Sequence, residues 1–91
     1  MTNDRERRIA RFHLDLVLAL FRAREEAAVS VADLAERSGL TSERLVAIEE
    51  GDTTVLSEIV LICDALEIAV ASVIPDEARS VERYDGVARV A

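Results

Sequence analysis

Helix breakers are nearly absent from this chain of 91 residues, which contains one proline, Pro75, and three glycines. Proline is tolerated poorly inside a helix, and glycine is common where a helix ends, so a chain with few of either can form long helices with few interruptions. Alanine, leucine, glutamate and arginine, which favour helices, are frequent. The sequence therefore predicts an all-α protein, and its length leaves room for one hydrophobic core.

Capping residues and apolar periodicity divide the chain into five expected helices. Ser30 and Thr41 are suited to cap the second and third helices, and Gly39 and Gly51 to end them. The expected helices cover 4–27, 31–38, 42–50, 55–66 and, as a brief last helix, 70–74. We expect residues 1–74 to form one helical domain and residues 75–91 to form a short C-terminal tail.

Charge and cysteine content exclude several classes of protein. The formal net charge is −7, which argues against a general nucleic-acid coat or a protein of anionic membranes. The single cysteine, Cys63, excludes an intramolecular disulfide and a cysteine-rich zinc site, and it fits a reducing cytoplasm. No apolar stretch reaches the ~18 to 20 residues of a membrane span.

No constellation of reactive side chains is visible in the sequence. His13 has no second histidine or cysteine at metal-ligand spacing, and Cys63 has no histidine partner that would make it a nucleophile. The pairs Glu25-Glu26 and Glu49-Glu50 are best explained as solvated helix ends. We therefore expect neither an enzyme nor a metal or cofactor site.

Residues 30–51 carry the spacing of a helix-turn-helix motif. Ala35 provides the small side chain needed where two helices cross, Gly39 allows the turn, and Leu45 faces inward six residues later. Beside these marks, the sequence resembles the lambda-repressor-like family, also called the Cro-repressor or XRE type of helix-turn-helix domain. The segments that carry the resemblance are 20–24, 30–41, 45–51 and 63–68.

The resemblance implies a five-helix domain with an extended first helix, in which the third helix reads the major groove of double-stranded DNA at an operator-like site. It implies a sequence-specific transcriptional regulator that acts as a homodimeric repressor. The base-reading residues would be Ser42, Glu43, Arg44 and Ala47. Phosphates would be held by Ser30, Thr41, Thr53 and Thr54, and the basic segment formed by Arg5, Arg7, Arg8 and Arg11 could flank the duplex.

The first helix has more apolar surface than one small core can cover. One face contains Ile9, Phe12, Leu16, Leu20 and Ala23, and a second contains Leu14, Val17, Leu18 and Phe21. The second face predicts a homodimer interface. In the alternative, the tail folds back over this face through its apolar residues Val81, Tyr84, Val87 and Val90.

A second function stays open because the motif is acidic. Residues 30–51 contain five acidic and two basic side chains, and Val31, Ala32, Val46 and Ala47 are apolar where a DNA reader commonly has polar groups. Counterion release, the main source of DNA affinity, would be weak on such a surface. The alternative is a helix-turn-helix fold used to bind another protein, as an antitoxin or a co-regulator does.

Overall fold

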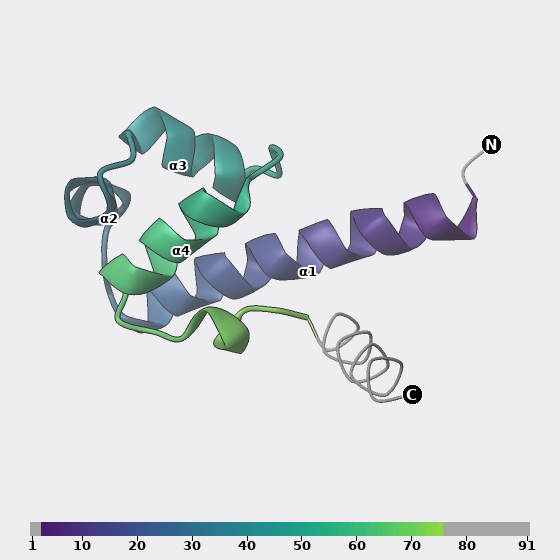
Figure 1. Ribbon diagram of the computed structural model, residues 1–91. Coiled ribbons are helices and arrows are strands. Elements are labelled where there is room, and N and C mark those ends of the chain that lie inside the picture. The colour runs from purple at the N-terminus through teal and green to yellow at the C-terminus, as the bar shows by residue number, and fades with distance from the viewer. Residues whose placement is uncertain (1–2, 76–91) are drawn as a thin grey trace.

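The computed structural model describes residues 3–75, and this part of the chain is all-helical, with no strand (Figure 1). It contains four α-helices, α1 (Asp4–Glu26), α2 (Val31–Ser38), α3 (Ser42–Glu49) and α4 (Leu56–Ala65). A single 3-10 turn, η1 (Val70–Ser72), follows α4. The expected tail residues Val81, Tyr84, Val87 and Val90 lie outside the described residues.

The predicted all-α class is confirmed, but the predicted count of five helices is wrong. The segment 70–74, expected as a fifth helix, forms only the turn η1. The turn η1 has three residues, and the five residues between Ala69, whose backbone is extended, and Pro75 are too few for a stable α-helix. Val73 nevertheless places its side chain in the core.

The helix starts follow the predicted caps. The Ser30 hydroxyl accepts a hydrogen bond from the Asp33 N–H at 3.1 Å, and the Thr41 hydroxyl accepts one from the Arg44 N–H at 3.0 Å. Each bond satisfies one of the N–H groups that a first helical turn leaves without a partner. Residues 39–41 are all that separates α2 from α3.

The helix ends depend on left-handed backbone conformations. Gly39 has φ 82° and Gly51 has φ 105°, which confirms the predicted glycine stops after α2 and α3. The turns after α1 and α4 use the same region with Ala28 and Glu67, at φ 57° and 58°. A residue with a Cβ costs about 1–2 kcal/mol in this region. The sequence therefore provides no glycine signal for the ends of α1 and α4.

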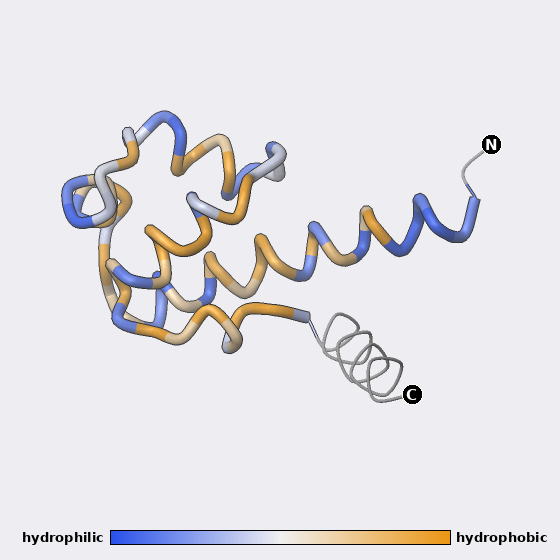
Figure 2. Tube along the Cα trace, viewed as in Figure 1, coloured by the Kyte–Doolittle hydropathy of each residue, from blue (hydrophilic) through white to orange (hydrophobic). Residues whose placement is uncertain are grey.

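The core lies where α1, α2, α3 and α4 meet. Helix α2 packs against α3 and α4, α1 packs against α3, and η1 packs against α4. The most deeply buried large side chains are Leu34, Leu45, Ile48 and Cys63. Figure 2 shows the hydrophilic start of α1 extending beyond this body. Ile9, expected in the core, is therefore exposed, whereas Leu16 and Leu20 are buried.

A largely buried ion pair joins the ends of α1 and α3. The Arg24 guanidinium donates to both carboxylate oxygens of Glu49, from Nε at 2.7 Å and from Nη2 at 3.0 Å. Its Nη1 donates to the Val29 carbonyl oxygen at 2.9 Å, in the α1–α2 connection. The Arg24 and Glu49 side chains are 11% and 16% exposed. Glu49 is thus not a solvated helix end, contrary to the sequence-based expectation.

Replacement of Arg24 by methionine should lower the free energy of unfolding by about 3 kcal/mol, because it leaves the Glu49 carboxylate largely buried without its counter-charge. Urea denaturation followed by circular dichroism measures this change. Arg22→Met is the matched control, since Arg22 is exposed on the same helix and its loss should change stability by less than about 0.5 kcal/mol. Equal effects of the two substitutions would contradict the assignment.

Candidate functional site

Three of the four predicted base-reading residues meet on the outer face of α3. Ser42, Glu43, Val46, Ala47 and Glu50 line one shallow hollow there. These positions follow one another at helical spacing, so they share a face opposite the buried Leu45 and Ile48. Of the residues predicted to read bases, Ser42, Glu43 and Ala47 lie on this face. Val46 and Glu50 also belong to this face. Val46 follows Ser42 by four residues and Glu50 follows Glu43 by seven, and this helical spacing was a sequence signal for a shared face.

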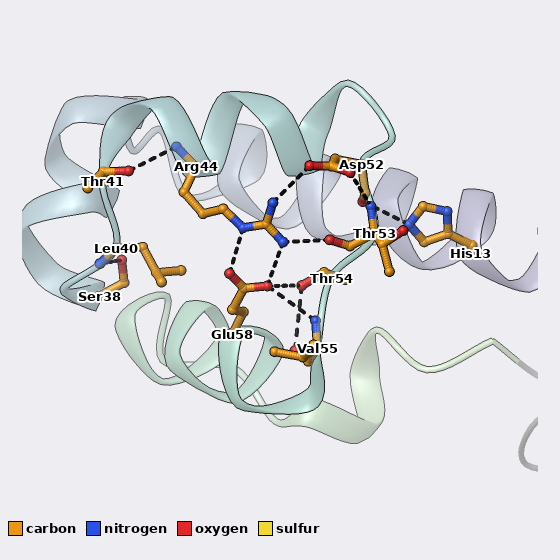
Figure 3. Close-up of polar contacts among 10 residues, drawn as sticks. All are labelled: His13, Ser38, Leu40, Thr41, Arg44, Asp52, Thr53, Thr54, Val55 and Glu58. Carbon is orange, nitrogen blue, oxygen red and sulfur yellow. Dashed lines mark hydrogen bonds and ion pairs between the residues drawn. The ribbon is translucent and has the colours of Figure 1, made fainter.

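Arg44 is not oriented toward this hollow. Figure 3 shows its guanidinium between α3, the loop 52–54 and the start of α4. Nε donates to Glu58 Oε2 at 2.6 Å and Nη2 to Glu58 Oε1 at 2.9 Å, while Nη1 donates to Asp52 Oδ2 at 2.9 Å. Nη2 also donates to the Thr53 carbonyl oxygen at 2.5 Å. Four of the five N–H donors of a guanidinium are thereby used within the chain.

The Glu58 carboxylate is the centre of this arrangement, although it was not among the residues predicted from the sequence. Besides Arg44, it accepts from the Thr54 hydroxyl at 3.0 Å and from the Val55 N–H at 3.2 Å. The bond from Val55 is half of a capping box at the start of α4. Val55 cannot provide the other half, because its side chain has no acceptor. Because valine is not a capping residue, the sequence offers no capping-box signal at this position.

These contacts change the acidity of both partners. The Arg44 hydrogen bonds lower the pKa of Glu58 from 4.5 to about 2, and the bonds from Val55 and Thr54 act in the same direction. The carboxylates of Glu58 and Asp52 raise the pKa of Arg44. Both groups therefore stay charged at neutral pH. The guanidinium charge is compensated within the protein and contributes little to the potential over the α3 face.

The residues predicted to hold phosphates fall into two separate groups. The serine and threonine residues form one group, and the arginines at the start of α1 form the other. Ser30 and Thr41 are exposed at the starts of α2 and α3, and Thr53 and Thr54 lie in the loop that holds Arg44. The basic residues Arg5, Arg7, Arg8 and Arg11 lie on the first turns of α1, at the far end of this helix from α2 (Figure 1). Because α1 has 23 residues, the two ends are about 34 Å apart. The structure does not bring Arg5 together with Ser30.

The predicted dimer residues also differ in exposure. Leu14, Leu18 and Phe21 are 57%, 40% and 37% exposed, respectively. Val17, by contrast, is buried. The prediction of Val17 as a surface contact is therefore wrong. It lies between the core-facing side and the outer side of α1, and not on the outer side itself.

The single histidine contacts a backbone carbonyl oxygen, and the single cysteine lies in the core. His13 Nε2 lies 3.0 Å from the Asp52 carbonyl oxygen, which connects the middle of α1 to the loop after α3. Cys63 is fully buried, and burial raises the pKa of its thiol. Within residues 3–75, no group of three or more histidine, cysteine, aspartate or glutamate side chains could hold a metal ion. In the same range, no helix has the length and apolar character needed to cross a membrane.

The Glu58 pKa predicts a specific dependence of stability on pH. Because this pKa is lower in the folded state, the unfolded state binds more protons between about pH 4.5 and about pH 2. The contribution of Glu58 is fully present above this window and is lost as the pH falls through it. Denaturation curves from pH 7 to pH 2.5 should show a stability difference between the wild type and Glu58→Gln that shrinks below about pH 4.5.

Glu36→Gln provides the control, since Glu36 is exposed on α2 and lies outside the Arg44 contacts. Its stability difference from the wild type should stay small at every pH. A Glu58→Gln difference of constant size across the window would show that the ion pair does not stabilise the fold.

Comparison of the chain with protein-family models, with curated proteins and with solved structures found no match.

Proposed function

We propose that the chain is a sequence-specific DNA-binding regulator that reads the major groove with α3. The main support for this proposal is the geometry of α2 and α3. Two eight-residue helices, joined by three residues, pack against each other, and the outer face of the second is exposed. Figure 1 views α2 along its axis and α3 from the side, so the two helices cross at a steep angle. This arrangement supports the proposal of a helix-turn-helix motif, in which two short helices are joined by a tight turn.

The proposal assigns base contacts to the outer face of α3 without Arg44. The Glu43 carboxylate can accept a hydrogen bond from a cytosine amine, and the Ala47 and Val46 methyl groups can contact thymine methyls. Arg44 instead holds α3 against the loop 52–54 and the start of α4, which sets the orientation of the reading helix. It is therefore a positioning residue. Its loss would change DNA binding through the geometry of α3.

Phosphate contacts must provide the affinity, because the α3 face carries Glu43 and Glu50 and no basic residue. The starts of α2 and α3 present N–H groups beside Ser30 and Thr41, where the helix dipole favours an anion. The arginines at the start of α1 add positive charge farther along the molecule. DNA binding of this kind is expected to be weak and sensitive to salt.

Selection from a pool of random duplexes, followed by fluorescence anisotropy at low salt, tests the proposal. Glu43→Ala should weaken binding to the selected site by about 1–3 kcal/mol and relax the preference at one base pair. Arg8→Gln should weaken all sequences alike and reduce the salt slope by about 1. Asp64→Ala, an exposed carboxylate on α4, is the control for Glu43. Recovery of no preferred sequence from the pool would overturn the proposal.

One observation favours a second function, in which α3 binds another protein. The hollow on α3 has the apolar side chains Val46 and Ala47 between the carboxylates Glu43 and Glu50, and Arg44 is turned away from it. Such a surface suits a basic amphipathic segment of a partner, as in an antitoxin or a co-regulator.

The double variant Glu43→Arg with Glu50→Arg separates the two functions. If α3 faces DNA, the added positive charge should strengthen non-specific DNA binding and steepen its salt dependence, because two repulsive groups become phosphate contacts. If α3 faces a basic protein, the variant should lose a partner that the wild type retains in affinity capture from native cells. The wild type and the double variant are compared in both experiments. Stronger DNA binding by the variant supports the first function, and loss of the captured partner supports the second.

A further inference from the structure

The outward side of α1 carries a regular stripe of six residues, which we call the outer stripe. Their spacing alternates between four and three residues, the pattern with which helices pair along their length. All six are exposed, and they lie roughly opposite the buried Leu16 and Leu20 on the helix circumference. The outer stripe consists of Arg7, Arg11, Leu14, Leu18, Phe21 and Glu25.

The charges of the outer stripe are ordered along the helix. Two arginines lie at its start, three apolar side chains at its centre, and Glu25 at its end. When a second copy of the helix is placed antiparallel, each position meets a position of the same stripe. Arg7 then faces Glu25 of the other copy, Arg11 faces Phe21, and Leu14 faces Leu18. A parallel pair would instead place Arg7 against Arg7 and Glu25 against Glu25, which is repulsive.

The shape of the molecule leaves room for this pairing. The start of α1 extends beyond the body formed by α2, α3 and α4 (Figure 1). In an antiparallel pair, this projecting half would lie along the second half of the other copy's α1, where Leu18 and Phe21 are exposed. Arg7 has a contact with Asp4 at 3.7 Å between side chains that are both well exposed. A guanidinium carries five N–H donors, so one arginine side chain can bind more than one carboxylate.

We propose that two copies of this chain form a two-fold symmetric dimer in which their α1 helices pair antiparallel through the outer stripe. The occupant of the exposed apolar face is therefore a second copy. The contact is isologous, since each copy contributes the same residues. This inference rests on the charge order and exposure of α1, and it holds whether α3 reads DNA or binds a protein.

A charge exchange tests both the dimer and its direction. Sedimentation equilibrium of the full chain should give a dimer for the wild type. Arg7→Glu and Glu25→Arg should each weaken the dimer by roughly 10- to 100-fold, because each substitution turns two symmetry-related attractions into repulsions. The double variant with both substitutions should recover the wild-type dissociation constant. A parallel dimer would gain no such recovery, since its like-charge pairs would persist.

Matched controls keep the experiment interpretable. Arg5→Glu and Glu26→Arg make the same charge changes at exposed positions of α1 outside the outer stripe, and both should leave the dimer intact. Leu18→Glu should give a monomer with unchanged helical circular dichroism. A wild-type chain that sediments as a monomer at high micromolar concentration would overturn the proposal, as would coverage of the face by residues 76–91. Failure of the double variant to recover would overturn the antiparallel direction.

Discussion

The ion pair between Arg24 and Glu49 is the contact on which the arrangement of the first three helices depends. Through three hydrogen bonds, the one guanidinium connects the end of α1, the end of α3 and the Val29 carbonyl of the α1–α2 connection. The ends of α1 and α3 are 25 residues apart in sequence, with α2 between them. A paired and largely buried charge has strict geometric requirements, since any displacement leaves it without a partner. The pair therefore determines where α3 presents its outer face.

A second ion pair determines what that outer face can do. Arg44 lies on α3, but its guanidinium is bound by Glu58 and Asp52, so its charge stabilises the junction of α3 with the loop and α4. The exposed face is left with two carboxylates and apolar groups. The same arginine cannot brace the helix and read a base at the same time. Arg44 thus sets the orientation of α3, whereas other side chains form its exposed face. The two functional proposals differ only in what this exposed face binds.

Local features of the sequence predicted much of this structure. Ser30, Thr41, Gly39 and Gly51 placed α2 and α3 to within about one residue, because capping bonds and left-handed turns involve neighbours along the chain. The same reasoning failed for 70–74, where apolar residues alone suggested a helix but the segment is too short to propagate one. Ser42, Glu43 and Ala47, which were predicted to read bases, line the same hollow on the outer face of α3.

The remaining features depend on contacts between distant residues. The sequence by itself determined that the chain is all-helical, that α2 and α3 are short and closely joined, and that α1 has surplus apolar surface. Only the tertiary structure decided that Glu49 and Glu58 are held by arginines and that Arg44 faces away from the α3 hollow. It also separated the buried Val17 from the exposed Leu14 and Leu18. Helical periodicity gives the direction of a side chain from its own axis, whereas its partners depend on how the axes pack.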